Sequence, residues 1–88
     1  MQAACDDLFT ALADPTRRRL FERLVREGEQ TVHALTAIAG VSQPMVSKHL
    51  AVLKTANLVC GRRQGRETHF SALPHSLLPL IEWAVCAQ

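Results

Sequence analysis

The stretch Ser-Gln-Pro-Met-Val-Ser-Lys-His-Leu-Ala-Val-Leu-Lys-Thr-Ala-Asn-Leu, residues 42–58, decides which fold this chain adopts. Ser42 is a favourable N-cap, and Pro44 lies in the first turn, where its missing N–H costs nothing. These two residues predict a helix that begins at residue 43. Asn57 stands where a helix ends in a left-handed residue, a conformation that Asn tolerates.

The predicted helix has two unlike faces. Val46, Leu50 and Leu53 recur at i, i+4 and i+7, which makes one apolar stripe. The opposite face carries donors, small residues and cations but no acid, namely Gln43, Pro44, Ser47, Lys48, Ala51 and Lys54. Such a face suits a helix in the major groove of DNA. An ordinary solvated surface helix has the same pattern, so the flanking segments must decide between the two interpretations.

Length and composition limit the protein class. The 88 residues are enough for one domain, and a hydrophobic content of 48% argues against disorder. No apolar run approaches the ~20 residues that cross a bilayer, and the N-terminus lacks signal-peptide features, so we expect a cytoplasmic protein. Three widely spaced cysteines do not form a disulfide framework, and we expect free thiols.

The net charge of +2 is unevenly distributed. Residues 1–40 carry five Arg against six acids, and residues 76–88 add one acid. Residues 41–75 carry five cations against Glu67 alone. Because this basic segment also contains the candidate recognition helix, it indicates a polyanionic partner.

The segments before residue 42 predict three helices. The first spans residues 6–13, with Leu8 and Leu12 one turn apart. Asp14-Pro15 is a helix start signal, and the second helix runs to about residue 27, before Gly28. A brief extended piece at 30–32 leads into a third helix, about 33–39, and a Gly-containing turn then completes a helix-turn-helix pattern. The residues expected to face the core are Leu20, Phe21, Leu24, Val25, Leu35 and Ile38.

After Asn57 the apolar period changes to two. Residues 58–63 and 67–72 predict strands joined by Gln64-Gly65-Arg66, with Phe70 packed beneath them. A basic hairpin directly after a recognition helix is typical of a wing that contacts the DNA backbone or minor groove. The DNA contacts expected from helix and wing are Ser42, Gln43, Pro44, Ser47, Lys48, Lys54, Arg62, Arg63, Gln64, Arg66 and His69.

The last predicted helix, residues 76–86, carries more apolar surface than one small domain can cover. Its apolar members are Leu77, Leu80, Ile81, Trp83, Ala84 and Val85. Excess apolar surface on a terminal helix suggests a partner, most simply a second copy of the chain.

Three motifs together resemble the arsenic-repressor (ArsR-type) family: Ala-Asp-Pro-Thr-Arg-Arg at 13–18, Gly-Val-Ser-Gln-Pro-Met-Val-Ser-Lys-His-Leu at 40–50, and Leu-Val-x-x-Arg-Arg-x-Gly-Arg at 58–66. The resemblance implies a mainly α fold with a small β-hairpin wing, a five-helix winged helix-turn-helix domain spanning 1–88. It also implies a transcriptional repressor on an inverted-repeat DNA operator. The family's homodimer forms through the first and last helices, so Leu8 joins the expected interface residues of the last helix. In many members an inducer releases the DNA.

The chain departs from the family's best-known sensor sites. Thr31 and His33 stand where some members carry a pair of cysteines, and the last helix lacks the ligands of zinc sensors. Cys5 and Cys86 would lie on the two interface helices, where they could bind a soft metalloid or form a di- or polysulfide. The alternative is that both are buried small hydrophobes. No cofactor is required, and the identity of any metal stays open.

Other functions have weaker support. No His-Glu-x-x-His motif, Gly-rich phosphate loop or Ser-centred nucleophile elbow occurs, so we do not expect an enzyme. Two alternatives to an inducible repressor remain. One is a winged-helix module that binds a protein partner, against which the basic wing argues, and the other is an autorepressor without an inducer.

Overall fold

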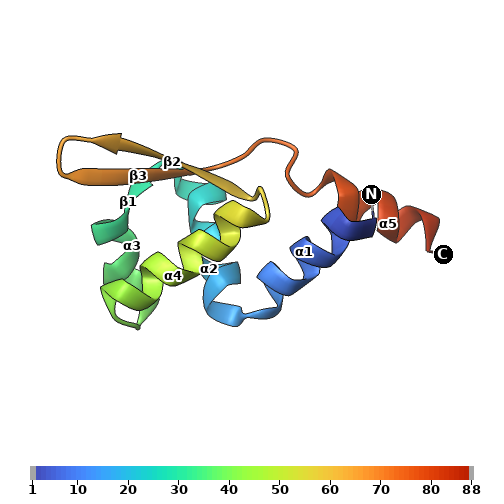
Figure 1. Cartoon of the computed structure of the whole chain (residues 1–88), viewed down its shortest axis with the longest axis horizontal. Coiled ribbons are helices and arrows are strands. Elements are labelled where there is room, and N and C mark those ends of the chain that lie inside the picture. The colour runs from blue at the N-terminus through green and yellow to red at the C-terminus, as the bar shows by residue number, and fades with distance from the viewer. Residues whose placement is uncertain (1, 88) are drawn as a thin grey trace.

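The computed structural model describes residues 2–87 and contains five helices and a small antiparallel sheet (Figure 1). The sheet has the strand order β1-β3-β2, with β2 and β3 forming the hairpin. The predicted winged helix-turn-helix architecture is therefore confirmed. In chain order the elements are α1 (Gln2–Ala13), α2 (Pro15–Glu27), β1 (Gln30–Thr31), α3 (Val32–Ala39), α4 (Gln43–Thr55), β2 (Val59–Gln64), β3 (Glu67–Ala72) and α5 (Leu78–Cys86).

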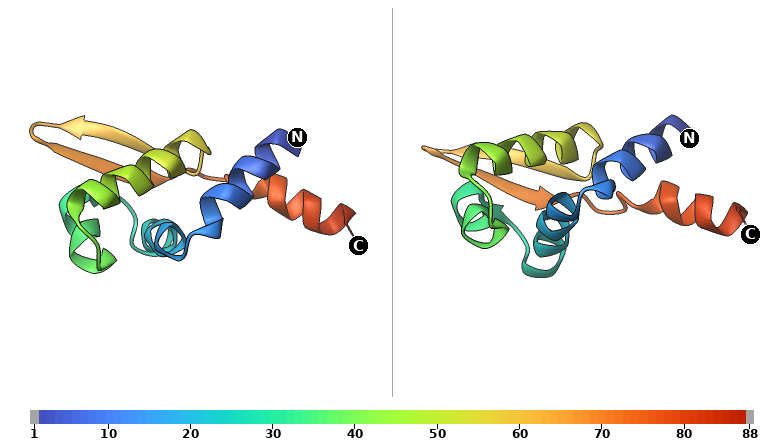
Figure 2. Two further views of the ribbon diagram at one scale, coloured as in Figure 1. Left: turned by 60° about the horizontal axis from the view of Figure 1, so that its bottom comes forward. Right: turned by 90° about the horizontal axis from the view of Figure 1, so that it is seen from below.

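The core lies where α2, α3 and α4 meet the root of the hairpin. Its largest fully buried side chains are Leu20, Leu24, Leu35, Val46, Leu50, Leu53, Leu58 and Val59. The molecule is elongated, 44 × 23 × 21 Å, with the hairpin at one end and α5 beside α1 at the other (Figure 2). Within residues 2–87, no helix combines the length and apolar character needed to cross a membrane.

The sequence signals at the helix ends act as predicted. The side chain of Asp14 accepts a hydrogen bond from the Arg17 N–H at 3.1 Å, and the Ser42 hydroxyl accepts one from Met45 at 3.4 Å. Asn57 has a φ of 61°, the left-handed conformation expected of it. The chain then turns directly into β2, because the Leu58 N–H donates to the Leu53 carbonyl at 3.0 Å.

Several predicted boundaries shift. α1 begins at Gln2 rather than residue 6, since Cys5 joins Leu8 on its buried side. α3 begins at Val32, because Thr31 caps it by accepting a hydrogen bond from the Ala34 N–H at 3.0 Å. Residues 30–31 pair with β3 and so form a third strand. α5 begins at Leu78 instead of residue 76, after a run of turns without a side-chain cap.

For two residues the prediction that they lie in the core is wrong. Val25 is 59% exposed, and Ile38 is 43% exposed. Each lies at the margin of its helix's apolar face, where neighbouring elements no longer cover it. Ala39, next to Ile38, is buried in its place.

Candidate nucleic-acid interface

The orientation of α4 is fixed by its buried stripe. Val46, Leu50 and Leu53 are fully buried against the core. Their burial turns the opposite side of the helix to solvent. Every residue predicted on this polar face is exposed, namely Gln43, Pro44, Ser47, Lys48, Ala51 and Lys54.

The hairpin brings basic side chains beside this face. Gln43 and Ser47 of α4 line a polar hollow of about 300 Å³ together with Arg63 and Arg66 of the hairpin. The start of α3, around Thr31, closes its third side. The structure thus places four of the predicted DNA contacts around one space, although they come from two segments of the sequence.

The pairing of β2 with β3 separates two neighbouring arginines. Arg63 lies opposite Thr68, and Arg62 lies opposite His69. Because successive strand residues point to opposite faces, these two pairs occupy different sides of the hairpin. The Arg63 side also carries Gly61, where a Cβ would come within 3.0 Å of the Phe70 ring. Phe70 packs against the core as predicted.

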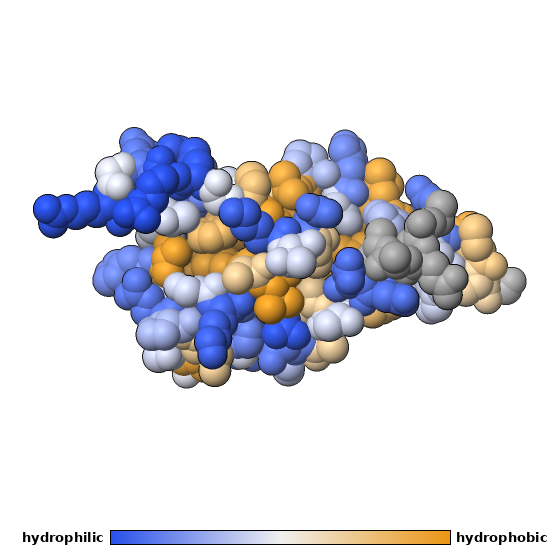
Figure 3. All heavy atoms as spheres, in the orientation of Figure 1, coloured by the Kyte–Doolittle hydropathy of each residue, from blue (hydrophilic) through white to orange (hydrophobic). Residues whose placement is uncertain are grey.

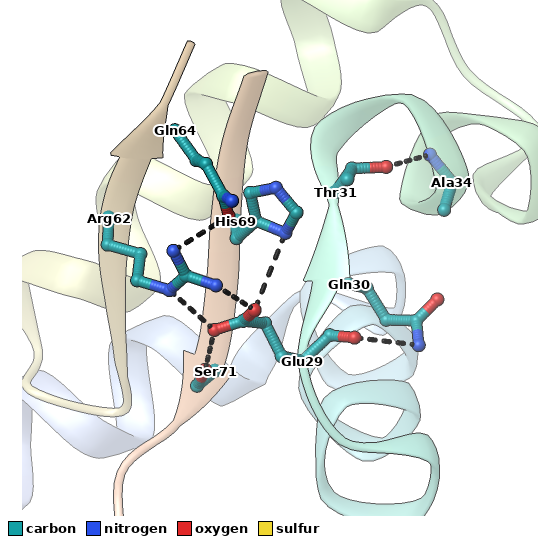
Figure 4. A network of polar contacts seen from close by, with 8 residues as sticks. All are labelled: Glu29, Gln30, Thr31, Ala34, Arg62, Gln64, His69 and Ser71. Carbon is teal, nitrogen blue, oxygen red and sulfur yellow. Dashed lines mark hydrogen bonds and ion pairs between the residues drawn. The ribbon is translucent and has the colours of Figure 1, made fainter.

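On the other side of the hairpin, Glu29 is the centre of a polar network (Figure 4). Arg62 donates from Nε to Glu29 Oε1 at 3.1 Å and from Nη2 to Oε2 at 2.7 Å. The Ser71 hydroxyl donates to Oε1 at 3.3 Å, and His69 Nδ1 lies 3.4 Å from Oε2. The hydrogen bonds from Arg62 hold the pKa of Glu29 below its ordinary value, and the Glu29 carboxylate raises the pKa of Arg62.

Glu29 was not among the residues predicted from the sequence. It stands 33 positions before Arg62, so no local motif connects them. The available signal was weaker: Arg62, His69 and Ser71 would share one face of the predicted hairpin. The acid of the hairpin on that face, Glu67, lies opposite Gln64 at the tip, and the acid that binds Arg62 comes instead from the turn after α2.

Two arginines of α2 donate hydrogen bonds to backbone carbonyls at the end of α1. Arg17 donates from Nε to the Ala11 carbonyl at 2.7 Å and from Nη2 to the Thr10 carbonyl at 3.1 Å, and Arg18 donates to Ala13 at 3.1 Å. Carbonyls in the last turn of a helix lack partners within it, so these contacts stabilise the junction. Arg17 Nη1 also lies 3.4 Å from Nδ1 of His49 on α4.

Apolar side chains remain uncovered at the end of the molecule that carries α1 and α5. The rings of Trp83 and Phe9 meet edge to face, with centroids 5.1 Å apart, yet Trp83 is 51% exposed. In Figure 3, hydrophilic side chains cover the wing, whereas apolar and hydrophilic ones are mixed over the rest of this face. The exposed residues here include three that were predicted to lie in the dimer interface, namely Ile81, Trp83 and Val85.

The other predicted interface residues differ in exposure. Ala84 is exposed, whereas Leu77 and Leu80 are half-buried against the chain's own core. Leu8 is only 2% exposed, so its side chain offers little surface to a second copy. Its side chain belongs to the chain's own hydrophobic core. The neighbouring Phe9 supplies the exposed apolar surface of α1.

The structure brings Cys5 and Cys86 to one hollow of about 640 Å³, which Phe9 and Trp83 also line. Cys86 is exposed, but Cys5 is only 3% exposed, and its Sγ donates to the Pro79 carbonyl at 3.4 Å. Cys60 is exposed on the wing. Among residues 2–87, no cluster of three or more His, Cys, Asp or Glu side chains could hold a metal ion.

Comparison with known proteins gives concordant matches. The model of a helix-turn-helix domain family matches residues 12–61. The HTH-type transcriptional repressor SmtB of Mycobacterium tuberculosis is 40% identical over 82 residues, which are 93% of this chain and 60% of that protein. The chain therefore spans about 60% of the length of this curated relative.

Two solved structures are also similar. An ArsR family transcriptional regulator superposes with a TM-score of 0.92 at 28% identity, over 100% of this chain and 90% of that one. A possible transcriptional regulator for arsenical resistance has a TM-score of 0.82 at 39% identity, over 91% of this chain and 82% of that one.

Proposed function

Because this chain belongs to the ArsR family of winged helix-turn-helix transcriptional regulators, we propose that it is a sequence-specific DNA-binding repressor. It acts as a homodimer on an inverted-repeat operator. The observation that carries the proposal is the hollow between α4 and the wing, where Gln43 and Ser47 stand beside Arg63 and Arg66.

The chemistry of this surface divides the DNA contacts into two kinds. Gln43 and Ser47 lie near the start of α4, the part of a recognition helix that meets base edges. Lys48 and Lys54 are exposed cations along the same helix and bind phosphate. The remaining predicted contacts are Ser42 and Pro44 at the start of α4 and Gln64 and His69 on the wing.

The homodimer follows from the uncovered end of the molecule. Phe9, Ile81, Trp83 and Val85 are all exposed on α1 and α5. A second copy related by a two-fold axis would cover this apolar patch and present two recognition helices. Their half-sites would be centred one or more helical turns of DNA apart, about 10 base pairs each.

Regulation of DNA binding is assigned to the two thiols of α1 and α5. Cys5 and Cys86 line one hollow, and the similar structure described as a possible regulator for arsenical resistance makes a soft metalloid the first ligand to test. A trivalent metalloid or a sulfur bridge held by both sulfurs would constrain α1 against α5. The test compares release of DNA by arsenite, disulfide and polysulfide for wild type and Cys5→Ser/Cys86→Ser. Equal responses would leave an autorepressor without a thiol inducer.

DNA selection from a random-sequence library tests the main proposal. The wild-type chain should enrich an imperfect inverted repeat, and gel shifts should show it binding that repeat more tightly than random DNA. Failure to enrich any sequence would favour the rival function, a winged-helix module that binds a protein partner.

A further inference from the structure

Glu29 connects the wing to the body of the molecule. It lies between α2 and β1, and its carboxylate contacts Arg62 of β2 together with His69 and Ser71 of β3 (Figure 4). One acid outside the hairpin thus holds side chains from both of its strands. The hydrogen-bonded strands β1 and β3 bring the backbone of this segment alongside the wing.

Each of the three nitrogens of the Arg62 guanidinium donates a hydrogen bond within the chain. Its Nε and Nη2 bind both oxygens of Glu29, and its Nη1 donates to Gln64 Oε1 at 2.9 Å. Two parallel hydrogen bonds between a guanidinium and a carboxylate fix geometry as well as charge. A DNA phosphate could take the Nε–Nη2 edge of Arg62 only by displacing this carboxylate. The pair is also neutral overall, so it attracts a polyanion less than a free arginine does.

Arg63 has the opposite surroundings. It lies on the other face of β2 and lines the hollow that contains Gln43 and Ser47 of α4. The position of the hairpin therefore determines how far Arg63 and Arg66 stand from the recognition helix.

We propose that Glu29 is a positioning residue for DNA binding, and that Arg62 is its partner rather than a phosphate ligand. By holding Arg62, His69 and Ser71, Glu29 sets the wing at the distance from α4 that the DNA requires. This inference rests on the proposed DNA-binding function, and it separates Arg62 from Arg63 and Arg66.

The direction in which one substitution changes the affinity for DNA distinguishes positioning from simple charge. Removal of an acid from a DNA-binding protein should, by charge alone, strengthen its binding to a polyanion. Positioning predicts that Glu29→Gln weakens operator binding instead. Glu27→Gln is the matched control, because Glu27 is an exposed acid at the end of α2 and should leave binding unchanged or slightly stronger.

The experiment measures affinity for the selected operator at several salt concentrations. Glu29→Gln and Arg62→Gln should each weaken binding about threefold, the scale of an exposed ion pair. The double variant should be no weaker than either single one, because the two residues act as one unit. The salt slope should stay unchanged in these variants, whereas Arg63→Gln should reduce it by about 0.9 for the lost phosphate contact. The exchanged pair Glu29→Arg/Arg62→Glu should bind more tightly than Arg62→Glu alone.

Two results would overturn the proposal: a salt slope that falls by about one unit in Arg62→Gln, or an exchanged pair that binds as weakly as Arg62→Glu. Amide hydrogen exchange without DNA gives an independent readout. Exchange in β2 and β3 should accelerate in Glu29→Gln while exchange in α1 does not, and unchanged exchange in the wing would also refute the inference. A wild type that selects no DNA would contradict the proposed function. Hydrogen exchange would still test whether Glu29 holds the wing.

Discussion

Helices α4 and α5 both carry apolar residues at helical spacing, but they use them differently. α4 buries Val46, Leu50 and Leu53 in the chain's own core, whereas no residue of α5 is buried. The apolar side of α4 is therefore already occupied, and its polar side is the surface left for a ligand. In α5 much of the apolar side itself stays exposed. The two helices show that the same sequence pattern marks a core or an interface, depending on what the rest of the chain can cover.

Truncation of one apolar side chain in each helix should show the difference between α4 and α5 most strongly. Leu50→Ala should lower the free energy of unfolding by about 2–5 kcal/mol, because it leaves a cavity in a packed core. Val85→Ala should change it by no more than about 0.5 kcal/mol at concentrations where the chain is a monomer, because Val85 is exposed. Urea titrations of both variants measure the difference. Equal losses would mean that α5 belongs to the core.

The next effect concerns assembly. Trp83→Ala should weaken dimerisation by about 2–4 kcal/mol, the range for an aromatic residue at the centre of an interface. Sedimentation should show monomer, while circular dichroism retains the helical signal. Val52→Ala, an exposed apolar residue on α4, is the control and should stay dimeric. A wild type that sediments as a monomer at micromolar concentration would contradict the homodimer.

A smaller effect tests the polar side of α4. Gln43→Ala should cost about 1–3 kcal/mol on the operator and leave random DNA nearly unaffected, because a base contact is lost. Lys48→Ala should weaken binding to both DNAs, because phosphate contacts carry no sequence information. Gel shifts on the two DNAs measure both changes. An equal loss on both DNAs for Gln43→Ala would show that this residue does not contact bases.

The smallest expected effect is a dependence of stability on pH. Hydrogen bonds from the Arg17 N–H and from Arg62 hold the pKa values of Asp14 and Glu29, respectively, below their ordinary values. Their contribution to stability is present above the unfolded-state pKa values and is lost as the pH falls through the lower folded-state values, below the ordinary range of a carboxyl group. Glu29→Gln should flatten this decline in urea titrations. The exposed Glu67→Gln is the control, and a decline as steep in Glu29→Gln as in wild type would contradict the assignment.

Local signals predicted most of the fold. The caps at Asp14 and Ser42 and the left-handed Asn57 each depend on a few neighbouring residues, so they can be recognised without tertiary information. Periodicity likewise placed the buried stripe of α4. It failed at Val25 and Ile38, because a period shows where an apolar face points and not how far its neighbours extend.

The candidate site was only partly accessible to the same reasoning. The sequence indicated Gln43, Ser47, Arg63 and Arg66 individually, but only the fold shows that they line one hollow. The contact between Arg62 and Glu29 joins residues of distant segments, and its existence depends on the strand register. Family resemblance indicated Leu8 as an interface residue, whereas the fold shows that its side chain is already buried within the chain.

The strand order β1-β3-β2 has a consequence for solubility. Within residues 2–87, β2 is paired only with β3, so one edge of this six-residue strand has no neighbouring strand. Such edges recruit strands from other molecules and start aggregation unless charge or shape prevents it. β2 has two consecutive arginines and a glycine where an aggregating strand would carry apolar residues. We therefore expect Arg62 and Arg63 also to oppose edge-to-edge pairing, and a wing stripped of its charge to be more prone to self-association.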